Sequence, residues 1–144
     1  MKLKVYSDGG ARGNPGPAGC GFVVYDEDNA LVKKDSIYIG STTNNQAEYK
    51  ALICALEYIT KELLEKYKIE QVECFLDSEL VVKQLNREYK VKHPDMIPLF
   101  AKVREYVMEL GGNVSFTHIR RELNTEADQL ANEAMDQGAY ISGQ

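Results

Sequence analysis

The sequence lacks any long hydrophobic run. No apolar stretch approaches the roughly 18 residues that a transmembrane helix needs, so we expect no membrane partner. Residues 1–6 read directly as a strand, with no apolar leader before it, and we therefore expect no signal peptide. Together these absences predict a globular protein that is located in the cytoplasm.

Cysteine and histidine are both scarce. Cys20, Cys54 and Cys74 lie far apart, each among apolar neighbours, which predicts free buried thiols in a reducing compartment rather than a disulfide framework. A catalytic cysteine would need a helper group, and the neighbouring sequence offers none. With only two histidines in the chain, no ligand spacing typical of a zinc site is present.

Linkers, internal repeats and low-complexity segments are also missing. The 144 residues, 44% of them hydrophobic and 27% charged, have the size and composition of one globular domain. We assign residues 1–138 to that domain and expect residues 139–144 to form a frayed polar tail. Nothing in the sequence indicates an obligate protein partner, and we expect a monomer.

Positive charge is in deficit, because the formal net charge is −5. Sequence-independent nucleic-acid binders are usually basic, but a nuclease can hold a phosphate backbone through a few local cations. Such cations gather in and after a predicted helix at 79–87, where a solvated surface is the default explanation and phosphate contact the alternative. They are Lys83, Arg87, Lys90, Lys92 and His93.

Hydrophobic alternation predicts three strands at the start of the chain, joined by short turns and therefore antiparallel. They cover residues 3–8, 19–25 and 31–39. Gly9 and Gly10 should break the first strand and leave Asp8 as its last residue. The ordinary interpretation of Asp8 is a loop residue that accepts backbone hydrogen bonds.

The rest of the chain alternates helices and strands. Capping-box spacing of Thr43 and Gln46 predicts a helix to about residue 66, with Glu48 beside its apolar face. A fourth strand at 69–76 follows a crossover helix and should lie parallel to the first. Further helices and a fifth strand then follow. They are expected at 79–87, 97–110 and 114–119, with a last helix from about 125.

Three more carboxylates join Asp8 at equivalent places. Asp77 ends the fourth strand, so it should face the same crevice as Asp8 at the carboxyl ends of parallel strands. Asp128 lies in the last helix, one position off its packed face. Two of them have an ordinary alternative, since Asp77 suits a helix N-cap and Glu48 a favourable partner of the helix dipole.

Four acids at one sheet edge repel one another unless cations lie among them. Oxygen ligands suit Mg²⁺ or Mn²⁺. Two such ions, bridged by shared carboxylates, suit phosphodiester hydrolysis, because one activates water and the other stabilises the leaving oxygen.

Four motifs in one order resemble type 1 ribonuclease H over nearly the whole chain. They are Asp8-Gly9-Gly10-x-x-Gly13-Asn14-Pro15-Gly16, Thr43-Asn44-Asn45-Gln46-Ala47-Glu48, Asp77-Ser78 and Asn124-x-x-x-Asp128-x-Leu130-Ala131. The resemblance implies a ribonuclease H-like α/β fold. Its five-stranded mixed sheet has three antiparallel strands, two strands parallel to the first, and helices on both faces. It also implies endonucleolytic cleavage of the RNA strand of RNA–DNA hybrids, giving 5′-phosphate and 3′-hydroxyl ends.

Residue roles follow from the same resemblance. Asp8, Glu48, Asp77 and Asp128 match the metal-binding catalytic acids. Asn14, Asn44 and Asn45 match polar groups that, in the family, recognise the minor groove and the 2′-hydroxyl groups of the hybrid. Thr43 matches a residue that contacts a DNA phosphate. The full set of expected substrate contacts is Gly9, Asn14, Thr43, Asn44, Asn45, Glu79, Arg121 and Asn124.

The chain departs from many relatives at three places. Many relatives carry a histidine in the loop before the last acid, and Arg121 is its positional equivalent here. Because arginine stays protonated, Arg121 can bind phosphate but cannot shuttle a proton. Glu79 stands where glutamine is common. The segment 86–96 is too short for a long basic protrusion, which predicts modest affinity for the hybrid.

Two other functions compete with this one. A different nuclease on the same fold is disfavoured, since Asp8-Gly9-Gly10 lacks the Asp-x-Glu pair expected of an exonuclease. A catalytically silent or weak nucleic-acid-binding module is disfavoured by the presence of all four acids.

Overall fold

The computed structural model describes residues 1–141. One five-stranded sheet forms its centre, with the strand order β3-β2-β1-β4-β5. The strands are β1 (Lys2–Ala11), β2 (Gly16–Tyr25), β3 (Leu31–Thr42), β4 (Gln71–Leu76) and β5 (Val114–His118). The first three pair antiparallel, while β4 runs parallel to β1 and β5 parallel to β4, as predicted.

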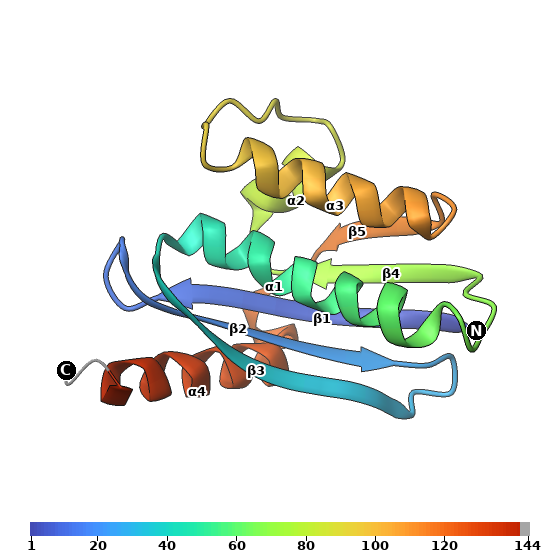
Figure 1. The fold of residues 1–144 in the computed structure, drawn as a ribbon, viewed down its shortest axis with the longest axis horizontal. Coiled ribbons are helices and arrows are strands. Elements are labelled where there is room, and N and C mark those ends of the chain that lie inside the picture. Colours follow the sequence, from blue (N-terminus) through green and yellow to red (C-terminus); the bar gives the residue numbers. More distant parts are fainter. Residues whose placement is uncertain (142–144) are drawn as a thin grey trace.

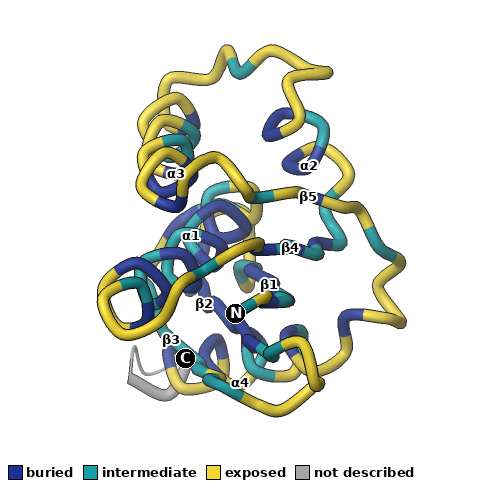
Figure 2. Tube along the Cα trace, turned by 90° about the vertical axis from the view of Figure 1, so that its right-hand side faces the viewer, coloured by how far each residue is buried: buried dark blue, intermediate teal, exposed yellow. Residues whose placement is uncertain are grey.

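Helices cover both faces of this sheet (Figure 1). They are α1 (Asn44–Tyr58), its π-helical end η1 (Ile59–Leu63), α2 (Glu79–Leu85), α3 (Ile97–Glu109), the short 3-10 turn η2 (Arg121–Leu123) and α4 (Thr125–Ile141). Figure 2 shows α1, α2 and α3 on one side of the strands and α4 on the other. The ribonuclease H-like α/β arrangement predicted from the motifs is therefore confirmed.

The predicted apolar faces form the core. The side chains of Ala47, Leu52 and Leu56 on α1, and of Ile59 at the start of η1, are fully buried, because their spacing puts them on one face of a helix. Leu52 and Leu56, with Ile59 at the start of η1, belong to one continuous apolar cluster that includes residues of β1 and β4. This packing fixes α1, and with it Glu48, against the sheet.

The prediction that Gly9 and Gly10 break the first strand is wrong. β1 continues to Ala11, because Gly9, Gly10 and Ala11 pair with Cys20, Gly19 and Ala18 of β2. The end of β1 is set by its pairing with β2, and the local sequence around Gly9 and Gly10 does not predict that pairing. The parallel pairing between β1 and β4 does end at Ser7 and Leu76. Asp8 and Asp77 are the next residues of the two strands, so they lie side by side just beyond that pairing.

Other boundaries shift by a few residues. The first helix leaves α geometry after Tyr58 and continues as η1 to Leu63, slightly short of the predicted end. The described residues contain free cysteines at the three predicted positions, and no described helix is long and apolar enough to cross a membrane. The predicted frayed tail begins too early, because residues 139–141 belong to the last helix, which runs to Ile141. Residues 142–144 lie outside the described residues.

Candidate active site

Three carboxylates converge at the edge where β1 and β4 separate. One oxygen each from Asp8, Glu48 and Asp77 lies within 4.8 Å of the others. The fourth acid, Asp128 of α4, lines the same cavity, whose volume is about 470 Å³. The topology explains the convergence, since parallel strand ends meet there and helices from opposite faces of the sheet bring the other two acids.

Burial makes it costly to ionise the carboxyl groups of this cluster. Asp8 and Glu48 are only 7% and 8% exposed. Burial raises the pKa of Asp8 to about 7, a hydrogen bond from Glu48 offsets part of the rise, and the charges of Asp77 and Asp128 add to it. Burial and then the charge of Asp8 raise the pKa of Glu48 well above its ordinary value.

The donor set fits a divalent cation. Glu48 Oε2 is buried and has no hydrogen-bond partner among the described residues, which is an uncompensated cost unless a ligand approaches it. A hard cation would supply that partner and offset the charge repulsion that, after burial, adds to both pKa values. Carboxylate oxygens without sulfur or imidazole nitrogen suit Mg²⁺ or Mn²⁺ better than zinc.

Asp77 does not cap the helix that follows it. Ser78 is the N-cap of α2, and its hydroxyl accepts from the Val81 N–H at 3.3 Å. The Asp77 carboxylate is thereby left for the cluster, and it accepts from Asn124 Nδ2 at 3.3 Å. The ordinary alternative for Asp77 is therefore wrong.

Asn124 occupies the position just before α4, as predicted, but its side chain is used elsewhere. Besides Asp77, its Nδ2 donates to the Ser7 carbonyl at 2.9 Å, and the residue is 1% exposed. It therefore ties the end of β4 to β1 from the start of α4. The buried side chain is already hydrogen-bonded within the protein. Its contact with substrate stays a prediction.

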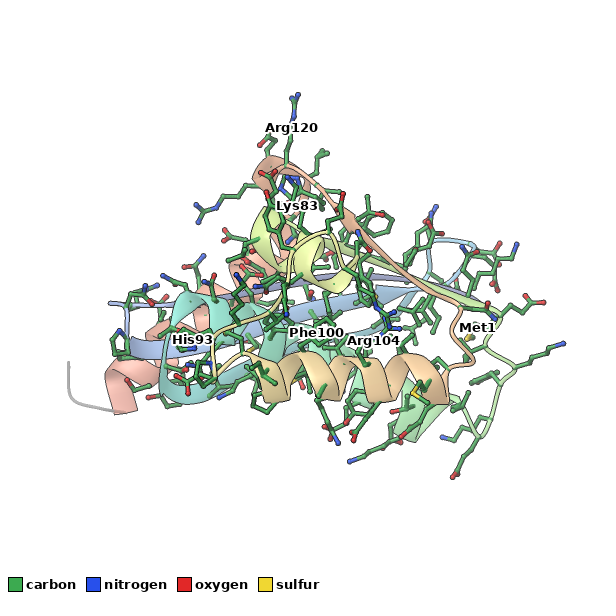
Figure 3. The ribbon with its side chains drawn as sticks, turned by 90° about the horizontal axis from the view of Figure 1, so that it is seen from above. Met1, Lys83, His93, Phe100, Arg104 and Arg120 are labelled. Atoms are coloured by element: carbon green, nitrogen blue, oxygen red, sulfur yellow. The ribbon has the colours of Figure 1, made fainter. Side chains whose placement is uncertain are left out.

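Arg121 reaches the cavity from η2. Its Nη2 lies 3.6 Å from Asp128 Oδ1, and its side chain is 79% exposed. The neighbouring Arg120 projects away from the body of the protein (Figure 3). Only one of the two arginines thus lines the acid cavity.

The predicted substrate contacts near α1 form a hydrogen-bonded group. The Thr43 hydroxyl caps α1 by accepting from Gln46 N at 3.3 Å, which confirms the predicted cap. Asn44 accepts from the Ala11 N–H at 2.8 Å through its side chain, and its own N–H donates to Asn14 Oδ1 at 3.0 Å. These bonds join the turn after β1 to the start of α1.

A second hollow, of about 530 Å³, begins beside the acid cavity and shares Asn44 with it. Asn14, Thr43 and Asn45 line it, as does His93 of the predicted basic segment. Glu79 lies outside both hollows and pairs with Lys83 at 2.9 Å. The substrate roles of these residues stay predictions.

Gly9 has a packing role that its sequence did not reveal. A Cβ atom there would lie 2.1 Å from the Ala47 carbonyl oxygen, so only glycine lets α1 approach β1 this closely. The Gly9 backbone also lowers the pKa of the Glu48 carboxyl in part, against the larger rise that burial causes. Gly9 therefore sets the distance between Asp8 and Glu48.

Two polar residues that line the acid cavity, Arg12 and Asn132, are not among the predicted site residues. Asn132 follows Asp128 by one helical turn, and its Nδ2 donates to the Asp128 carbonyl at 2.9 Å. The i, i+4 spacing was a usable signal for Asn132. Arg12 lies in a turn, where no periodicity marks it.

Comparisons with known proteins agree with this geometry. A family model described as reverse transcriptase-like matches residues 6–134. A ribonuclease HI of Caulobacter vibrioides is 32% identical over 152 residues, which covers 94% of this chain and 94% of that protein. The crystal structure of LC11-RNase H1 in complex with an RNA/DNA hybrid has a TM-score of 0.88 at 48% identity, over 94% of this chain and 97% of that one.

Some relatives are longer. A bifunctional protein of Mycobacterium tuberculosis is 40% identical over 140 residues, which is 96% of this chain but 37% of that protein. The chain thus spans little more than a third of that relative.

Proposed function

The chain belongs to the type 1 ribonuclease H family, and on that premise we propose that it is an endonuclease acting on RNA–DNA hybrids. It hydrolyses the RNA strand and leaves 5′-phosphate and 3′-hydroxyl ends. The observation that carries the proposal is the convergence of Asp8, Glu48 and Asp77 within 4.8 Å, in a cavity that Asp128 also lines. Hybrid is the ligand in the LC11-RNase H1 crystal structure, at 48% identity to this chain.

We propose that the four acids hold two Mg²⁺ ions when substrate is bound, with Mn²⁺ as a substitute. The ions supply an activated water and stabilise charge on the leaving oxygen. Asp8 and Glu48 are the buried members, so they fix the position of the cations. Asp77 and Asp128 are more exposed and reach the side from which a phosphodiester enters.

The other side chains bind and orient. Asn124 holds the Asp77 carboxylate. Arg121, permanently charged, attracts phosphate into a cavity that is otherwise acidic. Asn14, Asn44 and Asn45 offer amide groups at the entrance, where a 2′-hydroxyl can both donate and accept; this hydroxyl is what separates RNA from DNA. Thr43 and the adjoining hollow receive the uncleaved strand.

We further propose that the protein acts as a monomer in the cytoplasm. Support for the cytoplasm comes from the free thiols of the described cysteines, which suit a reducing compartment.

Cleavage of an RNA–DNA hybrid labelled at either RNA end tests the function. RNA–RNA and DNA–DNA duplexes serve as matched substrates, each with Mg²⁺, Mn²⁺ or EDTA. Internal cuts confined to the RNA of the hybrid, and abolished by EDTA, are expected. Stepwise shortening from one end would indicate an exonuclease, and binding without cleavage under any metal would indicate a binding module.

A further inference from the structure

Arg12 is a cation that lines the acid cavity. It has no role in the reaction proposed above. Among the described residues lining that cavity, Arg12 and Arg121 are the two cations, beside the four acids. A nucleic-acid strand gains affinity from each phosphate that an arginine or lysine contacts. Arg121 lies beside Asp128, and Arg12 lies elsewhere.

The present contacts of Arg12 are exposed. Its Nη1 lies 2.7 Å from Asp136 Oδ1, with side chains 46% and 65% exposed, and its Nη2 donates to Asn132 Oδ1 at 3.5 Å. Exposed ion pairs contribute little to stability. The pair with Asp136 therefore does not by itself account for an arginine here, and a phosphate can replace the carboxylate at low cost.

The two arginines lie at opposite ends of one side of α4. Asp128, Asn132 and Asp136 recur every four residues, so they share one face of the helix. Arg121 pairs with the first and Arg12 with the last. Eight residues of helix span about 12 Å, and one strand of a duplex advances about 3.4 Å per nucleotide along the axis. This separation between the two acids is long enough for the paired arginines to meet different phosphates of one strand.

The turn that carries Arg12 is held in place before substrate arrives. Arg12 N donates to the Pro17 carbonyl at 2.8 Å, and two residues later Asn14 accepts from Asn44 N at 3.0 Å. The turn lies beside the C-terminal half of α4 (Figure 1). Such a fixed backbone limits the ordering cost of a phosphate contact.

We propose that Arg12 binds a non-scissile phosphate of the strand that is cut, and so positions that strand along α4. This inference rests on the proposed function. In the complex the guanidinium exchanges Asp136 for the phosphate, while Asn132 keeps it oriented. Arg suits this exchange, because its planar fork matches a carboxylate and a phosphate alike.

Arg12→Ala and Asp136→Asn are a matched pair that separates phosphate binding from a structural role. Both remove the same ion pair, but only the first removes the cation. Affinity for fluorescently labelled RNA–DNA hybrid is measured by anisotropy in Ca²⁺, a hard cation with the same oxygen ligands, over a series of KCl concentrations. Turnover in Mg²⁺ is measured in parallel, and thermal unfolding verifies the fold.

We expect Arg12→Ala to weaken binding about tenfold and to reduce the slope of log affinity against log salt by about 0.9, the value for one phosphate contact. Asp136→Asn should bind as tightly as the wild type or more tightly, and Arg12→Lys should keep the salt slope. Equal weakening by Arg12→Ala and Asp136→Asn, or an unchanged slope in Arg12→Ala, would overturn the proposal.

The proposed function can fail separately. If the wild-type protein binds hybrid through Arg12 but never cuts it, the phosphate contact stands and the nuclease assignment falls. If it does not bind hybrid at all, both fall.

Discussion

The side-chain amide of Asn124 donates to the carboxylate of Asp77 at 3.3 Å. The same amide nitrogen donates to the Ser7 carbonyl at 2.9 Å, so one buried side chain holds a candidate metal ligand against the neighbouring strand. Loss of a residue that orients a metal ligand in this way typically lowers metal affinity or activity about 10- to 100-fold. The acid cluster therefore depends on a residue that carries no charge.

Replacing Asn124 with alanine tests that dependence. We expect turnover to fall about 10- to 100-fold, because Asp77 loses its orientation. The free energy of unfolding should fall by about 1–3 kcal/mol, because the Ser7 carbonyl loses its donor in a buried place. Steady-state kinetics and urea unfolding measure the two effects. Unchanged turnover in the folded variant would show that Asp77 is placed without Asn124.

Gly9→Ala should disrupt the site through the backbone. The new Cβ would lie 2.1 Å from the Ala47 carbonyl oxygen, so α1 must move away from β1 and carry Glu48 with it. We expect a loss of about 3 kcal/mol or more in stability, together with loss of activity.

Gly10→Ala is the matched control for that variant. Its Cβ would meet the end of the Met135 side chain at 3.3 Å, and methionine adapts to such contacts. Stability within about 1 kcal/mol of the wild type is expected. Equal damage from both glycine variants would mean that the close approach at Gly9 is not what positions Glu48.

The raised pKa of Asp8 makes metal-free stability depend on pH. Its pKa is about 7 in the folded protein, against an ordinary value of 3.8, so the folded state binds a proton that the unfolded state has released. Between these two values stability falls as pH rises, at most by ~1.4 kcal/mol per pH unit for one group. The contribution is fully present below about pH 4 and lost above about pH 7.

Asp8→Asn removes this dependence. In EDTA the variant should be more stable than the wild type at pH 8, and the difference should shrink toward pH 5. Thermal unfolding at the two pH values measures it. Adding Mg²⁺ should stabilise the wild type mainly at pH 8, since the ion needs ionised carboxylates. A gain from Asp8→Asn that is the same at both pH values would contradict the assignment of the burial cost to Asp8.

Arg121→Ala should affect activity but not the fold. The side chain is 79% exposed, so the free energy of unfolding should stay within about 0.5 kcal/mol of the wild-type value. Turnover should fall about tenfold, because a charged hydrogen bond to phosphate is lost. Arg120→Ala is the control, since Arg120 projects outward (Figure 3). If both variants keep the wild-type rate, Arg121 does not belong to the site.

Much of the site could be predicted, because patterns in the local sequence indicate where its acids lie. Helical periodicity placed Glu48 beside a buried face, and the crossover connection put Asp77 next to Asp8. The extension of β1 through Gly9 and Gly10 was not predictable in the same way, since it depends on pairing with β2. The use of the Asn124 side chain depends on Ser7, 117 residues away, and no local pattern encodes that contact.

The most direct test of the central claim is internal cleavage of the RNA in an RNA–DNA hybrid by the wild-type protein, compared with Asp77→Asn under the same Mg²⁺ concentration. The account predicts RNA fragments with 3′-hydroxyl ends from the wild type, none in EDTA, and almost none from a folded Asp77→Asn. Wild-type cleavage that survives EDTA, or equal cleavage by Asp77→Asn, would contradict a metal-dependent reaction at this cluster of acids.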